Sequence, residues 1–176
     1  VKLTYLIEEK PLGTAGGVKN AERYLDGTFV VFSGDVLTDI NLSKALSFHK
    51  QKGALATIVL TRVTNPTDYG IVITEKSGRI RKFLEKPGWG EVFSDTINSG
   101  IYILEPEALK HVRTDLEFDF SKNLFPALLE LGEPLFGYAA DGYWCDIGNP
   151  LQYLQANYDA LQGRLKVKIP GHEKNG

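Results

Sequence analysis

The 176-residue chain alternates between short, unbroken apolar runs and segments with helical spacing. A run of β-branched and aromatic residues without polar positions is typical of a strand covered on both faces. The run at 28–33 stops at Gly34 and Asp35, and we interpret it as the central strand of an α/β sheet. Because ligands of open parallel sheets bind beyond the carboxyl ends of the strands, Asp35 lies where chemistry is expected. An ordinary turn, or a cap for the helix beginning near Asn41, is the alternative role for Asp35.

The start of the chain predicts a strand, a loop, a helix and a second strand. Residues 1–8 alternate and then become apolar, as a strand does, and a glycine-bearing loop follows at 9–17. Helical spacing comes next, and the unit implies a parallel strand pair with a right-handed crossover. The three glycines before the helix are expected to leave backbone N–H groups open to an anion or a flat base. Glycines serving only loop geometry are the alternative, because the spacing matches neither phosphate-binding fingerprint.

The remaining pattern predicts further helices and strands in one domain over residues 1–163, followed by a basic tail over 164–176. Two strand pairs have the short connections of hairpins, namely 69–75 with 79–85 and 135–138 with 142–147. The predicted helices cover 42–52, 106–112, 119–131 and 151–162, and the other predicted strands cover 54–61 and 96–104.

Asp146 is the polar residue that the pattern singles out most clearly, because it stands between Cys145 and Ile147 in an apolar stretch. A buried carboxylate needs a cation, a metal or several hydrogen-bond donors. Helix capping is the alternative role, but Asn149 followed by Pro150 already supplies a cap for the next helix.

Two further polar pairs lie at strand ends. Asn98 and Ser99 precede an apolar run, so each requires a hydrogen-bond partner in the protein or in a ligand. Glu85 and Lys86 are neighbours at the end of a predicted strand and should point to opposite faces. Two solvated charges are the alternative interpretation of the second pair.

Composition and charge exclude several classes of function. The chain is 43% hydrophobic and 24% charged, as in ordinary globular domains. Its 20 basic and 22 acidic side chains give a net charge of −2 without a basic stripe, so neither nucleic acid nor an anionic membrane is an expected partner. The single cysteine, Cys145, excludes an intrachain disulfide and a multi-cysteine zinc site. No apolar run approaches the roughly 18 residues of a membrane span, and we expect a cytoplasmic protein.

Six short motifs agree in order and spacing with one family. They are Pro11-Leu12-Gly13-Thr14-Ala15-Gly16, Ser33-Gly34-Asp35, Asp68-Tyr69-Gly70, Glu85-Lys86-Pro87, Asn98-Ser99-Gly100 and Trp144-Cys145-Asp146-Ile147-Gly148. With these motifs the chain resembles the sugar-1-phosphate nucleotidyltransferases, and the first motif is most similar to that of mannose-1-phosphate guanylyltransferases. The resemblance implies a Rossmann-like α/β fold with a mixed, mostly parallel sheet flanked by helices.

The resemblance also implies roles for individual residues. Asp35 and Asp146 match the two aspartates that hold Mg²⁺, an ion that prefers oxygen ligands. Lys86 matches the lysine that contacts the sugar phosphate. The substrates implied are a nucleoside triphosphate and a sugar-1-phosphate, which react by in-line attack at the α-phosphorus with release of pyrophosphate. The residues matched to substrate binding are Glu8, Pro11, Gly13 and Thr14 around the base and Gly70, Glu85 and Asn98 around the sugar.

The chain departs from the family pattern at its start. It begins with Val1 inside a strand-like segment, and nothing matches the family's first strand and its glycine-rich loop with an arginine and a lysine. Each lost transition-state donor of this kind costs about 10²- to 10³-fold in rate. We therefore expect an N-terminally truncated segment with little or no activity alone, which pairing with another copy across exposed sheet edges would stabilise.

Two alternatives stay open at this point. The sugar and the base can be others within the family, such as glucose- or heptose-1-phosphate with another nucleotide. A non-catalytic regulatory subunit that binds nucleotide sugars is the second, although Asp35, Asp146 and Lys86 are all retained. The basic tail resembles the lead into a left-handed β-helix that follows this domain in many relatives.

Overall fold

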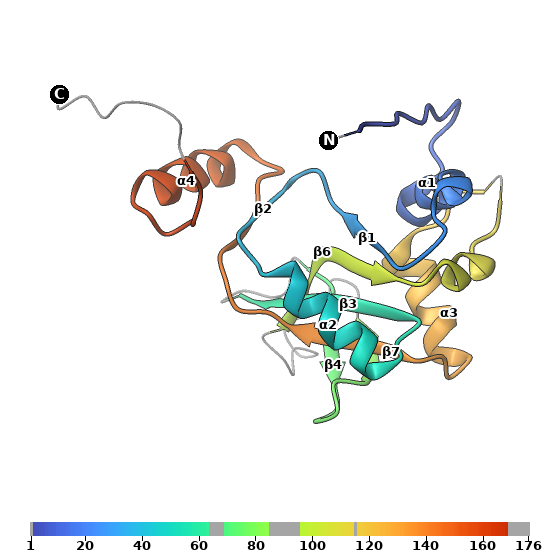
Figure 1. Cartoon of the computed structure of the whole chain (residues 1–176). Helices are drawn as coiled ribbons and strands as arrows, with labels where there is room; N and C mark the ends of the chain where they lie inside the picture. The colour runs from blue at the N-terminus through green and yellow to red at the C-terminus, as the bar shows by residue number, and fades with distance from the viewer. Residues whose placement is uncertain (1, 64–68, 85–95, 115, 169–176) are drawn as a thin grey trace.

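The computed structural model describes residues 2–63, 69–84, 96–114 and 116–168 (Figure 1). In this part of the chain a six-stranded sheet has the order β5-β4-β6-β3-β7, and β1 also pairs with β6. A separate two-stranded sheet joins β2 to β8. The strands of the main sheet are β1 (Phe29–Phe32), β3 (Ala56–Arg62), β4 (Ile71–Thr74), β5 (Ile80–Leu84), β6 (Thr96–Leu104) and β7 (Leu135–Ala139), and those of the small sheet are β2 (Val36–Thr38) and β8 (Trp144–Asp146).

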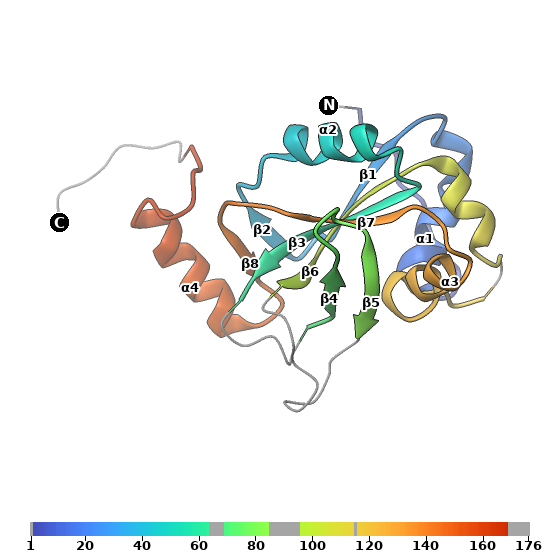
Figure 2. The same ribbon diagram turned by 90° about the horizontal axis from the view of Figure 1, so that it is seen from below.

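Helices cover both faces of the main sheet (Figure 2). The α2 helix lies over one face, whereas α1 and α3 lie toward the other. The α-helices are α1 (Gly13–Asn20), α2 (Leu42–Lys52), α3 (Phe125–Glu130) and α4 (Pro150–Leu161), and the shorter helical turns are η1 (Glu22–Tyr24), η3 (Pro106–His111) and η4 (Phe120–Leu124).

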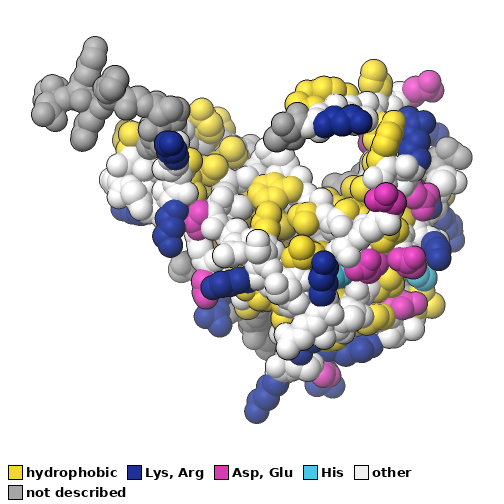
Figure 3. Space-filling model, viewed as in Figure 1, with side chains coloured by type: hydrophobic (Ala, Val, Ile, Leu, Met, Phe, Trp, Pro, Cys, Tyr) yellow, Lys and Arg dark blue, Asp and Glu magenta, His cyan; other side chains and the backbone are white. Residues whose placement is uncertain are grey.

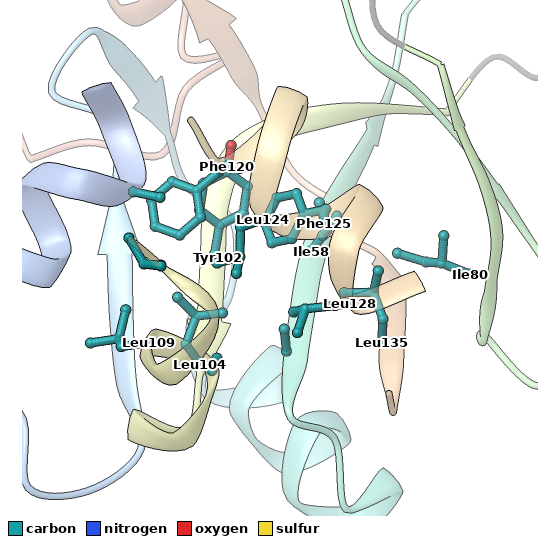
Figure 4. Packing of buried hydrophobic residues seen from close by; sticks show 14 of the residues in the cluster. Ile58, Ile80, Tyr102, Leu104, Leu109, Phe120, Leu124, Phe125, Leu128 and Leu135 are labelled. Carbon is teal, nitrogen blue, oxygen red and sulfur yellow. The ribbon is translucent and has the colours of Figure 1, made fainter. Parts of the chain in front are cut away.

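The two faces of the sheet enclose two separate cores, which explains why apolar residues dominate β3 and the second half of β6. In β3, Ile58 faces the larger core and its neighbour Val59 faces the smaller one. The larger core packs Phe120 and Phe125 against Tyr102, with ring centroids 4.8 and 5.0 Å apart (Figure 4). Successive strand residues point to opposite faces, so a strand with two covered faces is mostly apolar. Its buried polar residues, such as Thr57 and Ser99, have hydrogen-bond partners within the protein.

The prediction of the helix at 42–52 is confirmed at both ends. The Asn41 side chain accepts a hydrogen bond from the Lys44 N–H at 3.1 Å, and Gly53 ends the helix with a φ of 55°. Both features follow from capping chemistry, since a side-chain oxygen satisfies a free donor and glycine adopts the left-handed conformation at little cost. The prediction of a strand at 96–104 is likewise confirmed by β6.

The prediction of a first strand at 1–8 is wrong for residues 2–8, which form no strand. Leu3, Tyr5 and Ile7 are between 67% and 89% exposed. The segment has strand-like alternation, but a strand also requires a hydrogen-bonded neighbour, and residues 2–8 have none in the described structure. The predicted parallel pair with β1 is therefore also absent.

The interpretation of 28–33 as a central, doubly covered strand is wrong for the same reason. β1 pairs only with β6 in the described residues, and the pairing is antiparallel. Val30 and Phe32 are 43% and 44% exposed. The mixed α/β architecture is confirmed, but among the described pairings only that of β3 with β7 is parallel.

The second predicted hairpin is also wrong, because its two strands belong to different sheets. β7 joins the main sheet beside β3, whereas β8 leaves it to pair with β2. The first predicted hairpin is confirmed by the antiparallel pairing of β4 and β5. Pairing partners that are distant in sequence decide this difference, and local pattern does not reveal them.

The last helix, α4, lies away from the main sheet, beside the small sheet of β2 and β8 (Figures 1 and 2). Its capping is as predicted, since the Asn149 side chain accepts hydrogen bonds from Leu151 N–H and Gln152 N–H at 3.1 and 3.0 Å. Four apolar and aromatic residues recur at helical spacing along α4, namely Leu151, Leu154, Tyr158 and Leu161. All four side chains are exposed, with Leu151 79% and Leu161 75% exposed. None of the helices in the described residues is long and apolar enough to span a membrane.

Candidate functional site

The prediction of a loop at 9–17 is wrong from Gly13 onward, where α1 begins. We keep the name glycine loop for residues 9–17, against which the segment around Phe118 packs. Gly13 has a φ of +74°, and a Cβ atom there would lie 2.7 Å from the Phe118 carbonyl oxygen. That oxygen accepts hydrogen bonds from the N–H groups of Ala15 and Gly16 at 2.9 and 3.0 Å. The expectation that these N–H groups are open to an anion is therefore wrong for Ala15 and Gly16, because a segment distant in sequence already occupies them.

Two other predicted base-binding residues hold the loop in shape. The Glu8 carboxylate accepts a hydrogen bond from the Leu12 N–H at 3.1 Å. The Thr14 hydroxyl donates to Asp119 Oδ2 at 2.7 Å and accepts from the Phe120 N–H at 3.0 Å. Pro11, the fourth residue of this set, is exposed. The loop therefore has a fixed shape, supported from Glu8 on one side and Asp119 on the other.

A cleft of about 540 Å³ connects this loop to the end of β1. It is lined by Glu8, Gly13 and Thr14, by β1, and by the two residues after β1, of which Gly34 directly precedes Asp35. Figure 3 shows the molecule hollowed beneath the N-terminal segment, which arches over the opening. The volume falls within the range of about 300 to 1,000 Å³ that is usual for small-molecule sites.

The small sheet brings Asp35 and Asp146 together. Val36 pairs with Asp146 in the register of β2 and β8, and the Ile147 N–H donates to the Asp35 carbonyl oxygen at 2.9 Å. A Cβ atom on Gly148 would lie 2.8 Å from Asp146 Oδ1 and 4.0 Å from Asp35 Oδ2. Both side chains therefore approach the same point. Asp146 is half-buried and accepts a hydrogen bond from the Gly148 N–H at 2.7 Å.

This carboxylate pair fits a magnesium ion. Mg²⁺ is usually held by one or two carboxylates, with waters and substrate phosphates completing its octahedral coordination. Three oxygens of the pair accept no hydrogen bond from any described protein group, because only Asp146 Oδ1 is engaged. Within the described residues, no cluster of three or more histidine, cysteine, aspartate or glutamate side chains offers a complete protein cage for a metal.

Asn98 and Gly70, both assigned to the sugar by the resemblance, contact each other. The Asn98 N–H donates to the Gly70 carbonyl oxygen at 2.8 Å. The Asn98 side chain accepts from the Gly100 N–H at 3.0 Å and donates to the Tyr102 and Ser121 hydroxyls at 3.0 and 3.2 Å. These partners fix the amide, and contact with a sugar hydroxyl would share or replace one of them.

Glu85 and Lys86 lie outside the described residues, so their predicted roles stay predictions. The neighbouring Ser99 is now explained: it is buried, and its hydroxyl donates to the Val59 carbonyl oxygen at 2.7 Å. The predicted requirement for a partner is met within the protein.

The sequence reasoning assigned no role to the aromatic pair Tyr69 and Trp144, which adjoins the predicted site residues Gly70 and Asp146. The two rings meet edge to face with centroids 5.5 Å apart, and Trp144 Nε1 donates to the Ser99 carbonyl oxygen at 2.9 Å. Both aromatics belong to the motifs quoted above, so the signal was present. Their contact ties the loop before β4 to β8.

The thiol of Cys145 is less readily ionised than an ordinary cysteine thiol. Burial raises its pKa above the ordinary value, and Sγ lies 3.5 Å from the Asp146 carbonyl oxygen. A raised pKa reduces the thiolate, which is the reactive form. At neutral pH the Cys145 thiol is therefore a weaker nucleophile than an ordinary cysteine thiol.

Comparison with known proteins decides the family. The family model described as "Nucleotidyl transferase" matches residues 1–163. The chain belongs to the nucleotidyl transferase family. The relatives of this family member include sugar-1-phosphate nucleotidyltransferases, which confirms the resemblance seen in the motifs.

Two curated relatives and one solved structure illustrate the match. A UTP–glucose-1-phosphate uridylyltransferase of Synechocystis is 41% identical over 93% of the chain and 44% of its own length. A mannose-1-phosphate guanylyltransferase of Mycobacterium tuberculosis is 35% identical over 93% of the chain and 45% of its own length. The crystal structure of HddC from Yersinia pseudotuberculosis superposes with a TM-score of 0.74 at 26% identity, over 88% of the chain and 65% of that protein. The Rossmann-like fold class is thereby confirmed, and the chain spans about half the length of the curated relatives it matches.

Proposed function

We propose that this chain carries part of the active site of an enzyme that joins a sugar-1-phosphate to a nucleoside triphosphate. The observation that carries the proposal is the convergence of Asp35 and Asp146 near Gly148, with Asp35 directly after Gly34, a residue that lines the cleft. A metal-binding carboxylate pair beside a cleft of suitable size is what nucleotidyl transfer requires.

In the proposed reaction, a phosphate oxygen of the sugar-1-phosphate attacks the α-phosphorus of the nucleotide. The new O–P bond forms as the bond from the α-phosphorus to the bridging oxygen breaks, and pyrophosphate leaves with the electron pair. Asp35 and Asp146 would hold Mg²⁺, which neutralises the charge of the phosphates when it is bound. Lys86 would contact the sugar phosphate.

The residues that the resemblance assigns to substrate binding would position the substrates. Glu8, Pro11, Gly13 and Thr14 would surround the base, with the loop held rigid by the Phe118 segment. Glu85, Asn98 and Gly70 would contact the sugar hydroxyls. Positioning matters here because most catalysis of phosphoryl transfer comes from alignment and charge neutralisation.

Mannose-1-phosphate and GTP are the substrates we favour. The support is the Pro11–Gly16 motif, together with the match to the mannose-1-phosphate guanylyltransferase of M. tuberculosis. Glucose-1-phosphate with UTP is the second candidate, because the Synechocystis relative is named as a glucose-1-phosphate uridylyltransferase. A regulatory subunit that binds nucleotide sugar without turnover is disfavoured by the retained aspartate pair.

Pyrophosphate release by the complete gene product tests the proposal. The enzyme is assayed with Mg²⁺ and each combination of mannose- or glucose-1-phosphate with GTP or UTP. We expect release with one preferred combination, and a loss of at least about 100-fold in Asp35→Asn and Asp146→Asn, as for other losses of transition-state charge stabilisation. Asp141→Asn is the matched control, because Asp141 is an exposed carboxylate in the loop between β7 and β8. No release with any pair, or equal activity in all three variants, would refute the proposal.

The same assay on residues 1–176 tests the expectation that this segment alone has little or no activity. Activity equal to that of the complete gene product would show that no further phosphate-binding residues are needed.

A further inference from the structure

A second cleft lies on the opposite side of α1 from the candidate site. Its volume is about 380 Å³. Gly16, Lys19 and Asn20 line this cleft, whereas Gly17 and Val18 line the candidate site. Residues three and four apart share one side of a helix, so the two clefts use different faces of α1. The polar side chains around the second cleft are Lys19, Asn20, Glu22, Arg23, Arg113 and Thr114.

Two of the cations are held in place by neighbours. The Lys19 ammonium lies 2.8 Å from Glu22 Oε2, and the Lys19 side chain is only 16% exposed. The Arg23 guanidinium lies over the Tyr24 ring, 4.8 Å from its centroid. Held side chains lose less conformational freedom when a ligand binds than free ones do. Arg113 reaches the cleft from the segment after η3, far away in sequence.

The charge of this cleft is opposite to that of the chain. Its described lining carries three positive side chains and one negative, whereas the whole chain has a net charge of −2. The lining charges are those of the described residues alone, to which Asp115 does not belong. The carboxyl end of α1 adds about half a negative charge, which is smaller than the surplus of two positive charges.

We propose that this cleft, which we call the basic cleft, binds a small molecule that bears a phosphate group. A guanidinium offers paired N–H donors that match phosphate oxygens, and two arginines from different segments converge here. Asn20 and Thr114 add neutral hydrogen-bonding groups. The two net positive charges balance a phosphate dianion. The basic cleft binds its ligand independently of the nucleotidyl transfer proposed above.

Titration of ¹⁵N-labelled residues 1–176 with inorganic phosphate tests the basic cleft. Sodium chloride at equal ionic strength is the reference, because exposed charges are screened by salt. We expect saturable shifts of the Asn20, Arg23 and Thr114 amide resonances. The double variant Arg23→Gln/Arg113→Gln should bind phosphate at least tenfold more weakly, whereas Lys44→Gln, which removes an exposed cation of α2, should bind within twofold of the original chain.

Asn20→Asp provides a second test that leaves both arginines in place. Asn20 is exposed, so the added carboxylate has room but repels the ligand, and binding should again fall at least tenfold. Shifts that do not saturate would overturn the proposal. Equal phosphate affinity in the double variant and Lys44→Gln would also overturn it, as would saturable shifts confined to Gly34 and the candidate site.

Discussion

Replacing Gly13 by alanine should destabilise the chain through one identified contact. Gly13 has a φ of +74°, which costs an L-residue roughly 1–2 kcal/mol. The added Cβ atom would lie 2.7 to 2.9 Å from backbone atoms of Phe118, so that segment must move. Its movement endangers three hydrogen bonds, from Ala15 and Gly16 to the Phe118 carbonyl oxygen and from the Phe118 N–H to the Leu12 carbonyl oxygen.

The expected loss can be worked from these parts. Each hydrogen bond contributes about 0.5–1.5 kcal/mol net. Loss of one or two of the three, added to the backbone strain, gives about 1.5–5 kcal/mol. For a domain of this size, each kcal/mol lowers the melting temperature by roughly 2–4 °C. Gly13→Ala should therefore melt at least about 3 °C below the original chain.

Urea and thermal unfolding followed by circular dichroism measure the difference. Gly27→Ala is the matched control, because a Cβ atom on Gly27 meets nothing within 4 Å and Gly27 has no positive φ. Its free energy of unfolding should change by less than about 0.5 kcal/mol, as for most surface substitutions. Equal unfolding midpoints for the two variants would refute the packing of Phe118 against the glycine loop.

Three further outcomes follow from the structure. Phe125→Ala should cost about 3–5 kcal/mol in urea unfolding, because Phe125 is fully buried, whereas Leu131→Ala, at 62% exposed, should cost less than about 1 kcal/mol. The hydrogen bond from the Lys166 N–H lowers the pKa of Asp39 in the folded chain below its unfolded value. The ionised Asp39 therefore stabilises the fold above the unfolded pKa, and this stabilisation is lost as pH falls through the folded pKa. In a plot of urea midpoint against pH, Asp39→Asn should fall less steeply at acid pH than the original chain, and an equal fall would contradict this. Burial raises the pKa of Cys145, so its alkylation at neutral pH should be slower than in urea, with a pH profile displaced upward.

Local sequence patterns predicted those helices and strands whose own residues determine where they begin and end. The α2 helix follows from Asn41 and Gly53, and the doubly covered β6 follows from its apolar run. The caps of α2 are local, which is why its boundaries agree with the sequence pattern. The strand β6 agrees as well, but its pairing partners β1, β3 and β4 are distant in sequence and were not predicted.

Elements that depend on distant partners were not predictable in this way. β1 is wholly apolar and β3 is not, yet one side of β1 has no paired strand in the described structure, whereas β3 is paired on both sides. β7 and β8 are close in sequence but join different sheets. Long-range pairing decides both cases, and a local pattern does not encode it.

In the candidate site too, the sequence predicted some features and missed those that depend on distant segments. The resemblance matched Asp35 and Asp146, and their carboxylates approach one point in the fold. The Phe118 segment that closes the glycine loop carries no motif, so its occupation of the Ala15 and Gly16 donors was not foreseeable. Polar groups whose partners come from remote segments are the part of a site that sequence reasoning misses.

Manganese titration of ¹⁵N-labelled residues 1–176 tests the aspartate pair most directly. Mn²⁺ resembles Mg²⁺ in preferring oxygen ligands, and it broadens nearby amide resonances. The account predicts that Mn²⁺ selectively broadens Gly34, Val36, Ile147 and Gly148, that Mg²⁺ reverses the effect, and that Asp35→Asn and Asp146→Asn each abolish it while Asp141→Asn does not. Broadening that persists in both Asp35→Asn and Asp146→Asn would contradict the assignment of Asp35 and Asp146 to one metal site. The absence of any broadening at this end of the small sheet would contradict it as well.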